Sequence, residues 1–273
     1  MSTGVYLAEK KDGTLYYRSN ITYRDKHISL GSFSNERDAH QAYLESSALL
    51  NNRRITLDNY CSHTKHLSFE KAVSLLNYRD NGMYIKNPIY LQPKFFLYFL
   101  SERIELKFDI DDLFFYSRHK IIKRNGHLFV NEYGMQTGIL SRYGVKSYAV
   151  AGVDYIFANN DSYDYRYENI IVINRYRGVS KITRYGITKY KAYIHINGNY
   201  NIGLYSTEEK AAIAYNKAVD LARAAGISRN FQENYITDFS AKDYADIYTR
   251  LKISDRYLQY LASVSESYTK LPY

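Results

Sequence analysis

Residues 178–222 contain the pattern that decides the fold, GVSKITRYGITKYKAYIHINGNYNIGLYSTEEKAAIAYNKAVDLA. Polar and apolar residues alternate over 189–195, which is the pattern of a strand with one buried face. Tyr190, Ala192 and Ile194 fall on the inner side of this strand. The segment therefore predicts a sheet of which one face is covered and the other is free.

A turn and a helix complete the same segment. The pair Asn197-Gly198 is a strong signal for a tight hairpin turn, and a second alternating strand follows it. Thr207 or Ser206 is then suited to be the N-cap of a helix. The small and aromatic residues of that helix have the spacing of one helical face: Ala211, Ala214, Tyr215 and Ala218. We therefore expect a three-stranded antiparallel sheet with one helix on its back.

Residues near the N-terminus repeat this pattern. Residues 4–50 read GVYLAEKKDGTLYYRSNITYRDKHISLGSFSNERDAHQAYLESSALL, and both segments begin with Gly-Val. In both, the first alanine of the helix (Ala39, Ala211) lies nine positions after an inward residue of the last strand (Leu30, Ile202). Two copies of one module are therefore predicted.

The charge is concentrated in the second copy. The chain has 273 residues, with 37 Lys and Arg against 28 Asp and Glu, and its net charge is +9. Residues 171–235 contain ten basic and four acidic residues, so this segment alone contributes +6. A basic segment rich in tyrosine is typical of a nucleic-acid surface, and an ordinary solvated face is the alternative interpretation. The high overall tyrosine content, 32 residues, is also expected from an A+T-rich genome.

Both copies resemble the Apetala/ethylene-response-factor DNA-binding domain, which also occurs in phage integrases and mobile-element endonucleases. The resemblance rests on the initial G-V, an alternating strand that ends in Ile, then LGSF or IGLYST, then A..AY in the helix. It implies that each sheet lies in the major groove and that outward strand residues reach bases and phosphates. The arginine-rich contacts of plant members are mostly missing, so no base preference follows.

The resemblance also implies which residues bind DNA. The candidates in the second copy are Ser180, Lys181, Lys189, Lys191, Tyr193, His195, Asn199 and Asn201. Those in the first copy are Tyr6, Arg18, Asn20, Thr22, His27 and Ser29. We expect the second copy to be the stronger DNA reader.

The segment 158–180, ANNDSYDYRYENIIVINRYRGVS, resembles the tail of the HNH endonuclease motif, D-H-I-N-G-D-x-x-D-N-R-x-E-N-L. The resemblance implies a central ββα module. Where the motif has Asp-His, however, this chain has Ile156-Phe157, and the alternative register gives Asp154-Tyr155. Because phenylalanine neither accepts a proton nor binds a metal, we predict no catalytic residues, no metal and no cofactor. Asn169, Arg166 and Glu168 are then expected to brace a turn.

Other segments predict helices, a hairpin and no further chemistry. A helix is expected around 68–78 and a hairpin at Asn125-Gly126. The cluster Cys61, His63 and His66 lacks a fourth zinc ligand, and the acidic run 109–112 lacks the spacing of a calcium loop. A single cysteine forms no internal disulfide and favours a reducing compartment.

The C-terminal residues 236–273 predict two helices. Apolar residues of the second helix recur at helical spacing, at Tyr257, Leu258, Leu261 and Val264. These could pack on their own chain or pair with a second copy, which leaves a homodimer open. No apolar run is long enough to cross a membrane, and no signal peptide is expected.

Together these patterns predict an α+β protein in five parts. The expected parts are a first DNA-binding domain over 1–58, a helical connector over 59–84, a degenerate HNH-like domain over 85–176, a second DNA-binding domain over 177–235 and a helical tail over 236–273. The predicted function is sequence-specific binding of double-stranded DNA by a non-enzymatic, cytoplasmic and nucleoid-associated transcriptional regulator of bacterial, phage or mobile-element origin. The alternatives are a divergent metal-dependent homing endonuclease and a protein-interaction module that acts on a repressor or phage factor.

Overall fold

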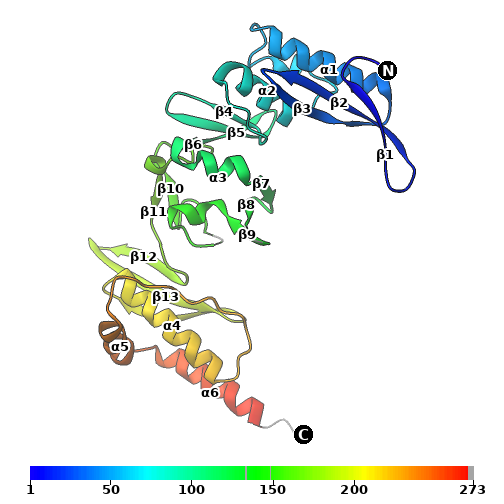
Figure 1. Ribbon diagram of the computed structural model, residues 1–273. Helices are drawn as coiled ribbons and strands as arrows, with labels where there is room; N and C mark the ends of the chain where they lie inside the picture. The colour runs from blue at the N-terminus through cyan, green and yellow to red at the C-terminus, as the bar shows by residue number, and fades with distance from the viewer. Residues whose placement is uncertain (133, 148, 270–273) are drawn as a thin grey trace. The chain divides into compact units, whose positions relative to one another are not determined.

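The computed structural model describes residues 1–132, 134–147 and 149–269. Short antiparallel sheets alternate along the chain with α helices, so the predicted α+β class is confirmed (Figure 1).

The chain divides into two compact units. The first is Met1–Ile139 with Ala158–Asn169, and the second is Leu140–Phe157 with Ile170–Tyr273. The segment predicted as one central domain, 85–176, is therefore shared between the two units and is not a unit of its own. The expectation of a separate HNH-like domain is corrected accordingly.

The first unit begins with the predicted sheet and helix. Strands β1 (Val5–Glu9), β2 (Leu15–Tyr23) and β3 (Lys26–Phe33) pair in that order, and helix α1 (Glu36–Asn51) packs on one face. The buried residues of the inner face are Val5, Ser19, Ile21, Ile28 and Leu30. Burial thus alternates along the strands as the sequence predicts.

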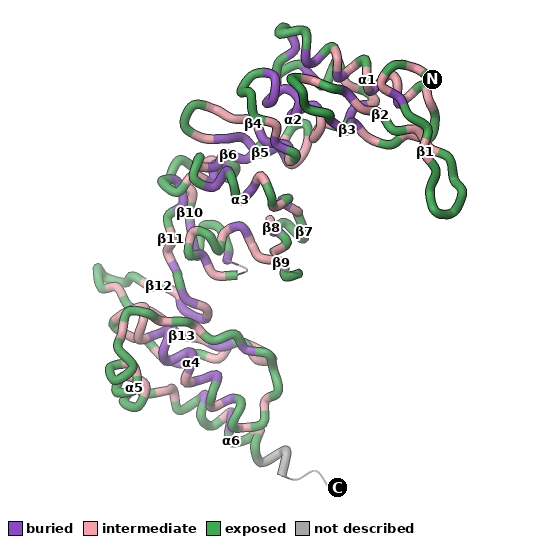
Figure 2. The backbone as a smooth tube through the Cα atoms, viewed as in Figure 1, coloured by how far each residue is buried: buried purple, intermediate pink, exposed green. Residues whose placement is uncertain are grey.

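The second unit contains the same arrangement. Strands β12 (Val179–Arg184), β13 (Ile187–His195) and β14 (Asn199–Tyr205) form a sheet covered by helix α4 (Glu208–Ala224). The buried residues of its inner face are Val179, Ala192, Ile194 and Ile202. Figure 2 shows that α4 is largely buried, as expected for a helix that covers a sheet.

The strand registers of the two copies agree residue by residue. A β-bulge interrupts the pairing of β2 with β3 between Ser19 and Asn20, and the pairing of β13 with β14 between Ala192 and Tyr193. In both sheets a glycine lies opposite the residue just before the bulge. The repeat that the sequence predicts is therefore also a structural repeat.

Both helices begin at side-chain caps. The Asn35 side chain accepts a hydrogen bond from the Asp38 N–H, and the Thr207 side chain accepts one from the Lys210 N–H. Of the two candidates for the second cap, Thr207 rather than Ser206 is the N-cap. Each cap satisfies one of the free donors of the first helical turn.

Residues 59–84 belong to the core of the first unit and are not a connector. They form a 3₁₀ turn (Tyr60–Ser62) and helix α2 (Phe69–Asn81), where the sequence predicts a helix. Apolar residues of α2 share one core with the first sheet and α1. The buried Arg79 donates from Nη1 to the Leu49 carbonyl at 2.7 Å, which ties α2 to the end of α1.

The rest of the central segment is built of small sheets. The strands are β4 (Ile89–Leu91), β5 (Phe95–Ser101), β6 (Ile104–Asp109), β7 (Ile121–Arg124), β8 (His127–Glu132), β9 (Met135–Gly138), β10 (Tyr155–Phe157) and β11 (Ile170–Val172). The sheets have the orders β4-β5-β6, β7-β8-β9 and β10-β11. The hairpin predicted at Asn125-Gly126 joins β7 to β8, and both of its turn residues have positive φ.

In the described part of 85–176 the α helix is α3 (Leu113–Arg118), and it follows the β5–β6 hairpin rather than the β7–β8 hairpin. The predicted ββα order is therefore wrong for the described part of 119–176, which includes the segment that resembles the HNH motif and contains no α helix. Strand β9 follows the β7–β8 hairpin, and β11 is followed directly by β12. Short 3₁₀ turns occupy Ile110–Asp112, Ile139–Tyr143 and Tyr167–Asn169.

The C-terminal segment forms two helices, as predicted, and they pack on their own chain. They are α5 (Ala241–Arg250), whose N-cap is Ser240, and α6 (Asp255–Thr269). Tyr257 and Leu261 of α6 are buried in the core of α4 and its sheet. Two of the four residues that left a homodimer open are thus buried within the chain, whereas Leu258 is 40% exposed.

Candidate nucleic-acid interface

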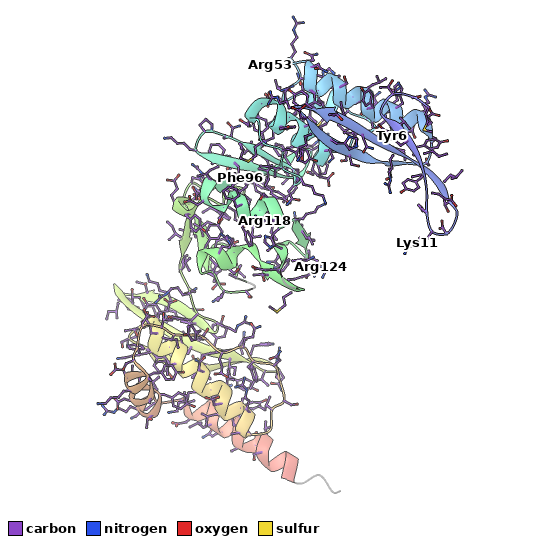
Figure 3. The ribbon with its side chains drawn as sticks, in the orientation of Figure 1. Tyr6, Lys11, Arg53, Phe96, Arg118 and Arg124 are labelled. Atoms are coloured by element: carbon purple, nitrogen blue, oxygen red, sulfur yellow. The ribbon has the colours of Figure 1, made fainter. Side chains whose placement is uncertain are left out.

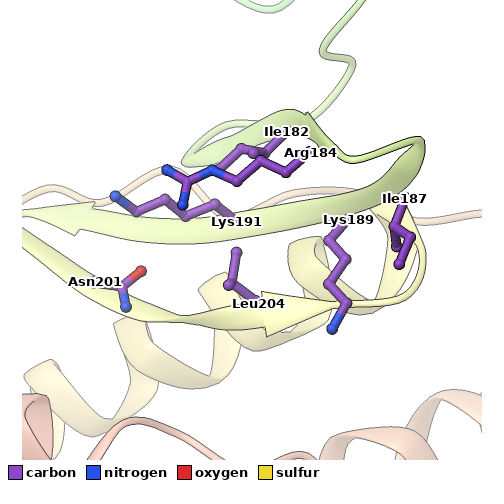
Figure 4. A pocket seen from close by; sticks show the side chains of 7 residues that line it. All are labelled: Ile182, Arg184, Ile187, Lys189, Lys191, Asn201 and Leu204. Atoms are coloured by element: carbon purple, nitrogen blue, oxygen red, sulfur yellow. The ribbon is translucent and has the colours of Figure 1, made fainter.

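The free face of β12, β13 and β14 carries a shallow hollow of about 380 Å³. Seven side chains from the three strands line it, as Figure 4 shows: Ile182, Arg184, Ile187, Lys189, Lys191, Asn201 and Leu204. The face lies opposite α4 because strand side chains alternate, and the intervening residues Ala192 and Ile194 are buried under the helix. The hollow is therefore an open, positively charged surface of the sheet.

The cations of this face are Arg184, Lys189 and Lys191. No side-chain hydrogen bond or ion pair of Arg184, Lys189 or Lys191 occurs within 1–132, 134–147 and 149–269. The acidic side chains of 171–235 lie on or beside α4, which covers the opposite face. Arg175 binds Glu208 and Glu209, and Arg223 binds Asp220 and Glu233. The sheet face thus keeps its positive charge uncompensated.

Other cations of the basic segment have structural partners, so the net charge of the sequence overstates the charge of the face. Lys217 donates to the carbonyls of Tyr248 at 2.8 Å and Leu251 at 2.9 Å, at the C-terminal end of α5. A cation at this end of a helix satisfies free carbonyls and interacts favourably with the helix dipole. Its role is to hold the tail.

A second polar hollow, of about 330 Å³, lies at the C-terminal end of β13, beside the residues that precede β12. Tyr193 and His195 line it together with Arg177 and Arg229. The two guanidinium groups are held by neutral acceptors, the Gln232 side chain at 2.6 Å and the Ile196 carbonyl. Their charge therefore remains available beside the sheet.

Most residues predicted for the second copy lie on the outer face. These are Ser180, Lys189, Lys191, Tyr193, His195, Asn199 and Asn201. The His195 Nδ1 lies 2.9 Å from the Asn199 Oδ1, across the hairpin. Lys181 is the exception: it pairs with Tyr190, so its side chain is on the α4 side of the sheet. Its expected place among the outward-facing candidates is corrected, because strand residues one position apart face opposite ways.

The residues predicted for the first copy also share one outer face. These are Tyr6, Arg18, Asn20, Thr22, His27 and Ser29. Figure 3 shows Tyr6 on β1 and Lys11 at the tip of the β1–β2 hairpin. The guanidinium of Arg18, however, donates to the Tyr16 hydroxyl at 2.6 and 3.0 Å. Arg18 therefore keeps its charge, but two of its N–H donors are already engaged by a neighbouring side chain.

Four residues of the hollow on the free face of β12–β14 were not predicted from the sequence: Ile182, Arg184, Ile187 and Leu204. Arg184 and Ile187 face each other at the β12–β13 hairpin, so a prediction needs the register of β12. Leu204 faces outward because the bulge after Ala192 shifts the alternation along β14. The Tyr185-Gly186 pair, whose residues both have positive φ, is a turn signal in the sequence from which the register of β12 with β13 could have been predicted.

The segment that resembles the HNH tail is held by its own contacts. The buried Asp164 accepts hydrogen bonds from Arg166, at 2.6 Å from Nη2, and the Asn169 amide donates to the Asp164 carbonyl at 2.8 Å. Glu168 forms an ion pair with Arg166 at 3.1 Å. Burial opposes ionisation of the Asp164 carboxyl, but the hydrogen bonds from Arg166 outweigh it and lower its pKa. Arg166 and Asn169 thus hold this turn, as predicted, whereas the Glu168 side chain is 75% exposed.

Where the motif has its catalytic residues, this chain has aromatic and paired groups. Burial raises the pKa of Tyr155, which lies in β10 opposite Val172. Asp154 forms an ion pair with Lys146 at 2.7 Å. Outside this segment, His66 of the Cys61, His63 and His66 cluster lies with its Nδ1 2.9 Å from the Glu45 Oε1. Over the described ranges, no three His, Cys, Asp or Glu side chains gather where they could hold a metal ion.

Comparison of the chain with protein-family models, curated protein sequences and solved structures finds no match. Among the described helices, none is both long and apolar enough to span a membrane.

Proposed function

We propose that this chain binds double-stranded DNA in a sequence-specific manner and regulates transcription at a bacterial, phage or mobile-element locus. The observation that carries the proposal is the segregation of charge in the second copy. Three cations that have no side-chain partner among the described residues lie on the outer face of β12–β14, while the acidic residues of the same module are bound by arginines beside α4. Phosphates would meet this face without displacing an internal ion pair.

The same face carries groups suited to base edges. Lys191 and Lys189 are able to donate to the guanine O6 and N7, and Asn201 is able to bind adenine bidentately. Arg177 and Arg229, at the end of β13, extend the positive surface toward flanking phosphates. In this mechanism the cations supply affinity, and the polar strand residues supply sequence preference.

The proposal is tested by selecting bound duplexes from a random pool and measuring affinity by fluorescence anisotropy at several salt concentrations. Replacing Lys191 by glutamine should weaken binding and lower the slope of log affinity against log salt by about one. The matched control is Lys181→Gln, which removes the same charge from the opposite face of the same sheet. Equal effects of the two variants, or selection of no duplex, would contradict the proposal.

A further inference from the structure

The outer face of the second copy pairs each cation with a branched aliphatic side chain across two strands. The three cross-strand pairs are Arg184 with Ile187, Lys189 with Ile182, and Lys191 with Leu204. All six residues line the hollow of about 380 Å³ described above, and Figure 4 shows them together. The hollow is thus lined by both apolar and positively charged side chains.

Two of the aliphatic side chains are far from buried. Ile187 is 64% exposed and Leu204 is 57% exposed, although both lie in regular strands. A single exposed aliphatic residue is ordinary. Here three aliphatic side chains line one hollow beside three cations. This combination indicates a ligand that has an apolar group flanked by negative charges.

The major groove offers such a group. Thymine presents a C5-methyl group at the groove edge, between two rows of phosphates, and aliphatic side chains contact it. We propose that Ile182, Ile187 and Leu204 read C5-methyl groups of thymine in the half-site bound by the second copy. This inference rests on the proposed DNA binding, and it adds which base feature the second sheet selects.

The first copy lacks these side chains at the equivalent register positions. Ser32 lies opposite Arg18, where Leu204 lies opposite Lys191 in the second copy. Ala8 stands in the place of Ile182. Because serine and alanine reach less far from the sheet, methyl dependence should be confined to the half-site of the second copy. The chain therefore supplies its own internal control.

Uracil substitution tests the inference, because deoxyuridine differs from thymidine only by the missing methyl group. Each thymine of the selected duplex is replaced in turn, and affinity is measured with the full chain. Loss of one contacted methyl group should weaken binding about fourfold. The effect should appear at one or two positions in the half-site of the second copy and at none in the other.

The variant Leu204→Asn assigns the effect to the side chain. Because Leu204 is exposed, the variant should melt at the temperature of the unmodified chain, which circular dichroism checks. At the position that Leu204 contacts, this variant should bind thymine and uracil equally, whereas Lys181→Gln should keep the preference for thymine there.

The outcomes separate this inference from the proposed function. Tight, salt-dependent binding that is insensitive to uracil everywhere would overturn methyl reading and leave DNA binding intact. Tighter binding of 5-methylcytosine than of thymine at the contacted position would overturn the assignment to thymine. Failure to bind any duplex would overturn both, and the exposed aliphatic residues would then favour a protein partner.

Discussion

The ring of Tyr215 on α4 lies against Gly178, so closely that a Cβ atom at this glycine would come within 2.2 Å of the ring carbon Cδ2. Gly4 and Tyr43 repeat the relationship at the same 2.2 Å in the first copy. Both glycines have positive φ, +67° at Gly178 and +76° at Gly4. The Gly-Val pair that begins each repeat is thus a packing site between the sheet and its helix.

Substitution of Gly178 should destabilise the second unit. Gly178→Ala would force the Tyr215 ring or the strand to move and would place a side chain in the left-handed region, so we expect a loss of about 2–4 kcal/mol in the free energy of unfolding. Urea unfolding followed by circular dichroism measures it. The matched control is Gly198→Ala, where no atom lies within 4 Å of the added Cβ and the loss should stay below about 1 kcal/mol. Equal losses would show that the contact is unimportant.

Alkaline pH should destabilise the fold through buried tyrosines. Burial raises the pKa of Tyr98 to about 12, against an opposing hydrogen bond from the Ile121 N–H, and burial alone raises the pKa of Tyr205 to about 12. In the unfolded chain the pKa is about 10. The folded state therefore holds protons that the unfolded state has released, so stability is full below pH 10 and falls between about pH 10 and 12.

For Tyr98, which is 1% exposed, the slope should be roughly 1.4 kcal/mol per pH unit within that window. Denaturant unfolding at a series of pH values measures it. Tyr98→Phe should remove this contribution and leave that of Tyr205, although it also costs a hydrogen bond at every pH. Tyr185→Phe, at an exposed hairpin tip, should leave the slope unchanged. An unchanged slope in Tyr98→Phe would assign the effect elsewhere.

The second copy should contribute more to DNA affinity than the first. Lys191 and Arg18 occupy equivalent register positions, but Arg18 is held by the Tyr16 hydroxyl and Lys191 has no side-chain partner in the described part of the chain. Lys191→Ala should therefore weaken binding of the selected duplex by about 1–3 kcal/mol, and Arg18→Ala by less. Anisotropy titrations at one salt concentration compare them directly. The reverse order would mean that the first copy is the main reader.

Two sheets on one chain should give a bipartite target. If the segment between them holds the two copies at a fixed separation, insertion of about 10 base pairs between the half-sites should be tolerated better than insertion of about half a turn. Footprinting a spacing series tests this. A smooth dependence on spacing would indicate a flexible connection, and protection of a single half-site would remove the first copy from the DNA-binding surface.

Nuclease activity should be absent. Tyr155 and Phe157 stand where the HNH motif requires histidine, and burial raises the pKa of Tyr155. Supercoiled plasmid and the selected duplex should both remain intact with magnesium or manganese. Cleavage that is lost in Asp154→Asn or Asp161→Asn would favour the divergent endonuclease instead, and the Lys181→Gln variant serves as the control for contaminating nuclease.

The sequence alone determined the two sheet-and-helix modules and the faces of their strands. Alternation of polar and apolar residues is a local pattern, and it specifies which side of a strand is buried without reference to the rest of the chain. For that reason Lys189, Lys191 and His195 lie where they were predicted. Asn125-Gly126 and the helix caps were predictable for the same reason, because turn and cap preferences act over a few residues.

Tertiary structure decided what distant segments do to one another. Lys181 was assigned to the wrong face because the phase of the short strand β12 is set by its hydrogen bonds to β13. Local periodicity also does not show that Lys217 holds α5, that Tyr257 is buried on α4, or that α2 shares the core of the first sheet. Each of these depends on burial between elements far apart in sequence, where the free energy comes from packing rather than from local preference.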